Sequence, residues 1–189
     1  EQHTFIEASK NKGYDVLLLD GVIDNHFINH MESKLENTSF VRVDSNSVDK
    51  LIDKDETIES VLTKEQEDKL KPIIEKQVEG KSGTFNVQFE SLSPNDQPIT
   101  LTKPEFMRRM KDMSQLGGNQ FMMGDMPDQY NLVINANHPL ISKIAGIKKE
   151  NDQTSLLNQA LDLALLSQNL LKGEALTKFI NRSVELIDN

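Results

Sequence analysis

Two histidines and an aspartate are the residues of this 189-residue chain whose spacing suggests chemistry. His26 and His30 lie four residues apart on a predicted helix, the spacing of two zinc ligands, but Phe27 stands where a metalloprotease requires glutamate. Asp20 follows an apolar run, a common position for a nucleophile or metal ligand in α/β enzymes, and Asp24 could be a second carboxylate. A small α/β hydrolase or phosphotransfer enzyme centred on Asp20 is therefore one hypothesis, although no further acidic cluster completes its site.

The other patterns give no support to catalysis. Gly80-Lys81-Ser82 resembles the end of a phosphate-binding loop, but Glu75 replaces the first glycine and a predicted helix precedes it in place of a strand. The chain has no cysteine, which excludes thiolate sites, and no serine lies in a nucleophile-elbow context. We therefore predict no catalytic residue and no metal ligand, and we interpret the two histidines as ordinary helix residues.

Methionine clustering is the strongest signal for function. Six of the seven methionines lie between Leu101 and Gln129. The run from Thr102 to Glu105 resembles a capping box with proline in the first turn, which predicts a helix that Gly117-Gly118 ends. The apolar run continues beyond the glycines into a segment of loop composition. Because methionine is flexible and polarisable, this region predicts an adaptable protein-binding surface, with ordinary core as the alternative.

Composition and charge exclude several classes of partner. The net charge is −9 and the lysines are scattered, which argues against nucleic acid or an anionic membrane as a partner. No signal peptide and no apolar run of membrane-spanning length are evident. The absence of cysteine suits a reducing compartment, so we expect a cytoplasmic protein.

The first 58 residues are predicted to form a small α/β piece. Residues 1–12 resemble the end of a helix, which suggests that the chain is a fragment of a longer protein. Residues 14–19 form an apolar run typical of a buried strand, residues 23–31 have helical spacing, and residues 39–43 alternate as a second strand. A parallel strand, helix, strand unit is expected. The acid-rich segment 44–60 is interpreted as a linker and domain boundary.

Residues 59–189 are predicted to form an α+β domain. A charged helix is expected from Thr63 to about Glu79, followed by a strand over Thr84–Glu90 and a loop over Ser91–Thr100. A second strand over Tyr130–Asn135 and a short helix over His138–Ala145 complete its first part.

Two apolar helices are predicted at the end of the chain. Eight leucines lie between Asp152 and Lys172 on nearly all sides of one helix, and a second helix after Gly173 has a wide apolar stripe. A symmetric pair of these helices, forming a four-helix bundle between two copies, would cover both surfaces. The alternative is that both helices pack on their own domain. The predicted dimerisation residues are Leu156, Leu157, Ala160, Leu161, Leu163, Ala164, Leu166, Leu170, Leu171, Leu176, Phe179, Ile180, Val184 and Ile187.

Several of these segments together resemble one family. The run Lys12-Gly13-Tyr14-Asp15-Val16-Leu17-Leu18-Leu19 with Ile23-Asp24 is similar to the end of the middle domain of the heat-shock protein 90 chaperones. Tyr130–Asn135 with His138-Pro139-Leu140-Ile141 resembles a strand and turn of their C-terminal domain, with Ala136 in place of the usual proline. The two apolar helices stand where that family has its dimer bundle. The resemblance covers nearly the whole chain and is strongest to the bacterial type.

The resemblance implies a homodimeric chaperone fragment whose Met-rich helix contacts unfolded or partly folded clients. The intact protein would use ATP and Mg²⁺ in an N-terminal domain, so no cofactor and no ATPase activity are expected here. Helical-repeat co-chaperones should not dock, because the chain ends without the acidic motif that they bind. The predicted client-binding residues are, by resemblance, Phe106, Met107, Met110, Met113 and Leu116, and, by composition of the following loop, Phe121, Met122, Met123 and Met126.

Overall fold

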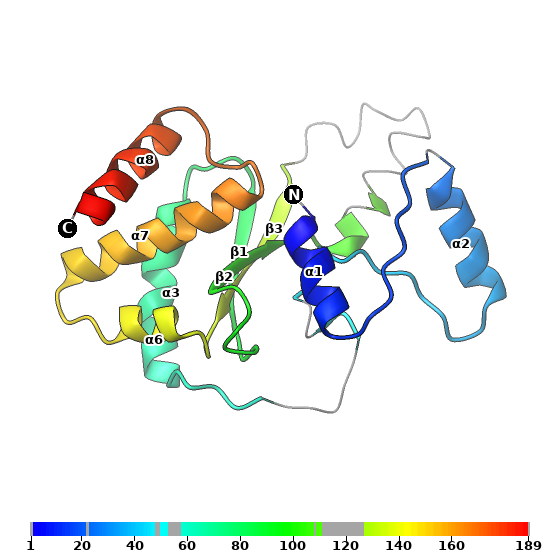
Figure 1. The fold of residues 1–189 in the computed structure, drawn as a ribbon, viewed down its shortest axis with the longest axis horizontal. Helices are drawn as coiled ribbons and strands as arrows, with labels where there is room; N and C mark the ends of the chain where they lie inside the picture. Colours follow the sequence, from blue (N-terminus) through cyan, green and yellow to red (C-terminus); the bar gives the residue numbers. More distant parts are fainter. Residues whose placement is uncertain are drawn as a thin grey trace.

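The computed structural model describes residues 2–21, 23–47, 50–52, 58–107, 109–110 and 127–188. Its elements are α1 (His3–Asn11), α2 (Asp24–Lys34), α3 (Lys64–Val78), β1 (Thr84–Glu90), β2 (Ile99–Thr102), β3 (Gln129–Asn135), α6 (Pro139–Ala145), α7 (Glu150–Ser167) and α8 (Gly173–Asp188). Figure 1 shows α3, α6, α7 and α8 grouped at one end of the molecule and α2 at the opposite end. The described residues form a mixed α+β fold, as predicted.

The sheet is built around β3. β1 pairs with β3 in parallel, and β2 pairs with its other edge in antiparallel orientation, giving the order β1-β3-β2. Alternate side chains of a strand point to opposite faces, so Leu132 and Ile134 share one face, and both are fully buried. Val133 points to the other face and is also buried, which leaves the central strand covered on both sides.

The helices α3, α6 and α7 cover the Leu132 and Ile134 face of the sheet. α3 begins with the predicted capping box, in which the Gln66 N–H donates to Thr63 Oγ1 and the Thr63 N–H donates to Gln66 Oε1. Leu70 and Ile74 of α3 belong to the same core cluster as the apolar residues of β3 and α7. The predictions of α3, β1, β3 and α6 are therefore confirmed, with boundaries within a residue or two.

β2 is a strand where a loop was predicted. The loop expectation for Ser91–Thr100 is wrong at its end, because Ile99–Thr102 pairs with β3. Ile99 and Leu101 are buried while the threonines alternate with them. The prolines Pro98 and Pro104 gave this short segment the composition of a loop. The strand is stabilised by pairing with the edge of β3 that β1 does not occupy.

The predicted strand, helix, strand unit at the N-terminus is wrong. The helices α1 and α2 are present, and Gly13, with φ of 75°, ends α1 as expected. Residues 14–19 and 39–43 are not strands, and Leu18 is 80% exposed. A strand requires an edge to pair with, and none of the described strands pairs with either segment. Local apolar composition cannot supply that edge.

The beginning of the predicted linker is attached to the sheet domain. Asp44, Ser45 and Ser47 are buried, although the acid-rich composition suggested a solvated segment. Ser47 Oγ donates to the carboxylate of Glu90 at 2.8 Å, and the Lys103 N–H donates to the Asp44 carbonyl at 3.0 Å. The division into residues 1–58 and 59–189 stays a prediction.

Two buried asparagines after β3 hold the surrounding loops. Asn135 Nδ2 donates to the Ser93 carbonyl at 2.8 Å, and Asn135 Oδ1 accepts from the Asn137 N–H. Asn137 accepts from the Val61 N–H at 2.7 Å and donates to the Leu92 carbonyl. Because buried backbone groups need partners, this turn connects residues 59–61 and the segment after β1 to the central strand.

We predict that Asn137→Ala destabilises the fold by about 1–3 kcal/mol, because it leaves the Val61 N–H and the Leu92 carbonyl without their partner. Urea unfolding of both proteins measures the difference. The control is Asn86→Ala, which removes an exposed amide that contacts Asn131 on the same sheet. Equal unfolding free energies for the two variants would contradict this role of Asn137.

Candidate functional site

The helical turn that carries the predicted contact residues begins at Glu105. Residues 105–107 and 109–110 are helical, so a helix is present where the sequence predicted one. The predicted capping role of Thr102 is wrong. Thr102 is the last residue of β2, its side chain is fully buried, and its hydroxyl has no hydrogen-bond partner. Because Thr102 pairs with Asn131 of β3, it belongs to the sheet and does not cap the helix.

Three predicted client-binding residues lie on this turn. Phe106 is 70% exposed, an unusual environment for a phenylalanine side chain, and Met107 and Met110 are half-buried. The other six predicted residues lie outside the described part of the chain: Met113, Leu116, Phe121, Met122, Met123 and Met126. The described turn therefore presents an apolar side chain to solvent.

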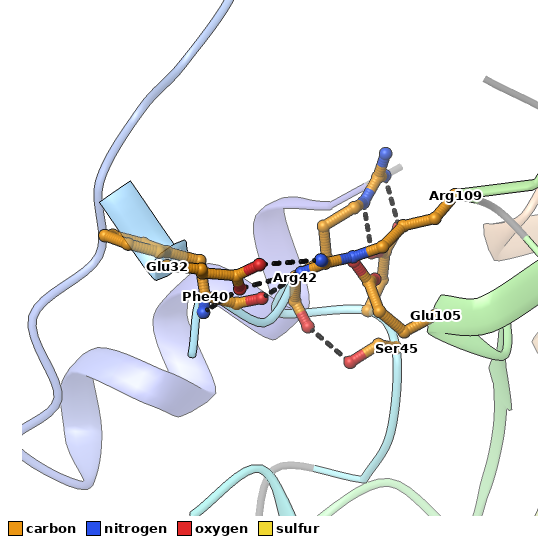
Figure 2. Close-up of polar contacts among 7 residues, drawn as sticks. Glu32, Phe40, Arg42, Ser45, Glu105 and Arg109 are labelled. Atoms are coloured by element: carbon orange, nitrogen blue, oxygen red, sulfur yellow. Dashed lines mark hydrogen bonds and ion pairs between the residues drawn. The ribbon is translucent and has the colours of Figure 1, made fainter. Parts of the chain in front are cut away.

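An ion-pair network connects this turn to α2. Arg109 Nη1 and Nη2 donate to the two carboxylate oxygens of Glu32 at 2.8 and 3.0 Å, and Nη2 also donates to the Phe40 carbonyl at 2.8 Å. Arg109 Nε donates to Glu105, one helical turn earlier, at 2.9 Å. Glu32 in turn accepts from the Phe40 N–H at 2.7 Å. Figure 2 shows Arg109 extended between Glu32 and Glu105.

A second set of contacts holds the segment that follows Phe40. Arg42 donates through Nε and Nη2 to the two oxygens of Asp44, each at 2.8 Å, and Gln2 also donates to Asp44. Ser45 Oγ donates to the Arg42 carbonyl (Figure 2). The loop between α2 and the sheet domain is thereby attached both to α1 and to the turn at Glu105.

The charges in this network are strongly stabilised. The hydrogen bonds from Arg109 lower the pKa of Glu32 to about 2, with further lowering by the Phe40 N–H, although burial acts in the opposite direction. The same bonds raise the pKa of Arg109 above its usual range. Burial tends to raise the pKa of Asp44, but the bonds from Arg42 and Gln2 outweigh it, so this pKa is lowered. The network stays ionised throughout the physiological range.

The second candidate surface is formed by α7 and α8. α7 ends at Ser167 and Asn169 has a positive φ of 56°, so the predicted leucine helix stops before Leu170. Half-buried predicted dimerisation residues are Leu156, Leu170 and Leu176, and those buried in the core of the same chain are Leu157, Ala160, Leu161, Ala164, Leu171 and Phe179. The buried face of α7 therefore packs on its own domain, as the alternative interpretation predicted.

An apolar surface remains exposed on the same two helices. Leu163 is 53% exposed and Ile187 is 85% exposed, and the other exposed members of the predicted set are Leu166, Ile180 and Val184. α8 buries only Phe179 among its described residues. Gln159 donates to Ser183, and Asp162 accepts from Arg182, so polar bonds connect the two helices. We call the five exposed residues Leu163, Leu166, Ile180, Val184 and Ile187 the α7/α8 stripe.

The candidates for catalysis are not brought together. Asp20 is exposed in an extended segment and does not end a strand, so the predicted enzyme site lacks its structural basis. Asp24 accepts from the Gly21 N–H at the start of α2. His26 and His30 are exposed, and within the described ranges no three His, Cys, Asp or Glu side chains gather as metal ligands. Gly80 has φ of 74° and follows α3, a helix ending that does not cradle phosphate.

The Glu32 and Arg109 pair was not among the predicted site residues. Glu105 and Arg109 are four residues apart, which is a readable signal for an ion pair on one helix. Glu32 is 77 residues from Arg109, and nothing in local sequence connects them. None of the helices in the described ranges is long and apolar enough to cross a membrane.

Comparison with known proteins identifies the family. The family model for the Hsp90 protein matches residues 1–185. The chain belongs to the Hsp90 family. Chaperone protein HtpG of Porphyromonas gingivalis (strain ATCC 33277) is 34% identical over 251 aligned positions, covering 98% of this chain. HtpG of Bacteroides fragilis (strain 638R) is 31% identical with 99% coverage, and that of Buchnera aphidicola is 31% identical with 94% coverage.

The Hsp90-family relatives are longer than this chain. It spans 37% of the length of the Porphyromonas and Bacteroides chaperones and 27% of the Buchnera one. The resemblance inferred from Tyr14–Leu19 and from the turn after β3 is therefore confirmed at the level of the bacterial Hsp90 family. Because the chain spans only part of its relatives, any activity of the complete proteins is a proposal for this chain.

We predict that the Glu32 carboxyl titrates near pH 2 and that Arg109→Met raises its pKa toward 4.5. Because the pKa is lowered in the folded chain, the contribution of the pair to stability is complete above about pH 4.5 and is lost as the pH falls toward 2. Carbon-13 NMR of the Glu32 side chain measures the titration. Arg182→Met, which removes a different ion pair, should leave it unchanged. A Glu32 pKa near 4.5 in the unmodified chain would contradict the network.

Proposed function

We propose that this chain is the C-terminal part of an Hsp90-family chaperone, where it joins two copies and contacts partly folded client proteins. The observation that carries this proposal is that large apolar side chains remain exposed outside the buried core on two elements of interest. One is the turn with Phe106, and the other is the pair of helices with the α7/α8 stripe. Exposed apolar surfaces beyond scattered residues mark sites of interaction with other molecules.

The α7/α8 stripe supports self-association. Its residues alternate with buried ones on α7, so that Leu163 and Leu166 face outward while Leu161 and Leu165 complete the core. Full burial of each exposed leucine, isoleucine or valine is worth about 1.5–3 kcal/mol before the costs of association. A second copy related by a two-fold axis presents the same stripe and buries it in a four-helix bundle.

The Phe106 turn supports contact with unfolded chains. Phe106 is exposed and Met107 and Met110 lie partly exposed beside it, so three large apolar side chains are available to a flexible partner. Methionine repacks against differently shaped side chains, which suits low-specificity binding. The remaining predicted contact residues, from Met113 to Met126, are part of the same proposal.

The intact chaperone is proposed to use ATP and Mg²⁺ in a domain other than this one, and to work in the cytoplasm without binding nucleic acid or membrane. The described residues do not fit a nucleotide and metal site, because they include no group of three possible metal ligands and Gly80-Lys81-Ser82 follows a helix. We therefore assign no ATPase step to this chain. Its proposed contribution is to hold two copies together and to contact client proteins.

We predict that Phe106→Ser with Met110→Ser weakens client binding at least about tenfold, because two apolar side chains no longer become buried on the client. The measurement is fluorescence anisotropy with labelled, reduced and carboxymethylated lactalbumin as the unfolded probe. The matched control is Val61→Ser, which removes an exposed apolar side chain elsewhere on the chain. Unchanged affinity of the double variant would reject the client-contact assignment.

Engineered cysteines test the proposed interface, because the natural chain has none. Single variants Leu163→Cys, Ile180→Cys and Val184→Cys should give covalent dimers with a short bismaleimide, since each residue lies on the α7/α8 stripe. Leu18→Cys, at a residue that is 80% exposed and distant in the sequence, should give little product. Equal yields at Leu18 and on the stripe would argue against this interface.

A further inference from the structure

The guanidinium of Arg109 fixes the direction of the Phe106 turn. It makes four N–H donations between 2.8 and 3.0 Å, to two oxygens of Glu32, to the Phe40 carbonyl and to Glu105. A guanidinium is planar and presents its donors in a rigid fork, so paired bonds to a carboxylate set orientation as well as distance. The turn is therefore held at a defined angle to α2.

The ion-paired side of the turn determines where its apolar side points. Glu105 and Arg109 are one helical turn apart and lie on the same row. Phe106 and Met110 each follow these residues by one position, so their row is rotated by about 100° around the helix. With the charged row turned toward Glu32, Phe106 remains 70% exposed. Rotation of the turn would move this side chain.

Charged side chains make this attachment. α2 has no fully buried residue, and both Phe27 on it and Ile23, which is its N-cap, are exposed. Glu32 and Arg109 side chains are only 19% and 33% exposed, so their pair is shielded more than an ordinary surface ion pair. Glu32 also accepts from the Phe40 N–H, which connects the loop after α2 to the same carboxylate.

We propose that Arg109 is the positioning residue of the client-contact turn, and that its bidentate pair with Glu32 makes α2 and this turn move as one unit. This inference rests on the proposed function of Phe106 and Met110. It assigns to α2 the role of aiming the apolar side chains of another segment. Pre-orientation of the turn removes part of the ordering cost of client binding.

Breaking the pair should cost affinity without removing any contact residue. Arg109→Gln and Glu32→Gln should each weaken binding of the labelled lactalbumin about three- to tenfold, corresponding to the ordering cost of one or two side chains. The double variant should bind no more weakly than Arg109→Gln alone, because that single variant already removes the pair with Glu32. Amide hydrogen exchange at residues 105–110, measured by NMR, should become faster in all three variants.

Arg182→Gln is the matched control, since it removes the ion pair between α8 and Asp162. It should leave both the client affinity and the exchange at residues 105–110 unchanged. Additive losses from the two single variants, or unchanged exchange in Arg109→Gln, would overturn the proposal. If Phe106→Ser with Met110→Ser loses binding while Arg109→Gln does not, the client contact stands and the positioning role is rejected. If the serine variant binds normally, the client contact fails, and the exchange rates alone decide whether Arg109 holds the turn.

Discussion

Burial of β3 is the constraint on which the rest of the structure depends. The strand is paired along both edges, and Leu132, Val133 and Ile134 are almost completely removed from water. A strand without an exposed edge or face requires a helix layer on one side and a tightly bonded loop layer on the other. α3 and α7 provide the first, and the turn with Asn135 and Asn137 binds the loops that begin near Glu59. The core is therefore completed within one copy of the chain.

Because the core is complete within one copy, the apolar residues outside the core need another explanation. Leu163, Val184 and Phe106 are not needed to cover β3, and each is more than half exposed. In the proposed function, such residues contact a second copy or a client. α2 adds a third kind of attachment, because none of its residues is fully buried and the pair of Glu32 and Arg109 connects it to another segment. The proposed contacts thus lie on separate elements of one folded chain.

The parts of the fold that local sequence determines were predicted well. The capping box at Thr63 and the alternation in Thr84–Glu90 each depend on neighbours within a few residues. β2 was missed and strands near Leu18 were predicted wrongly, because both outcomes depend on whether a distant edge is available for pairing. For the site, a helical turn was expected correctly around Phe106 and Met110, and its contact with clients stays a prediction, whereas Arg109 was missed because its partner Glu32 is 77 residues away. Long-range charge pairing leaves no periodic pattern to read.

The solution mass of the chain tests the central claim most directly, which is that the α7/α8 stripe is an interface between copies. Multi-angle light scattering over a dilution series is the measurement. The account predicts a mass near twice 21.4 kDa at high concentration and a fall toward 21.4 kDa on dilution. A mass of 21.4 kDa at every concentration would contradict it, because the exposed stripe would then have no second copy to cover it.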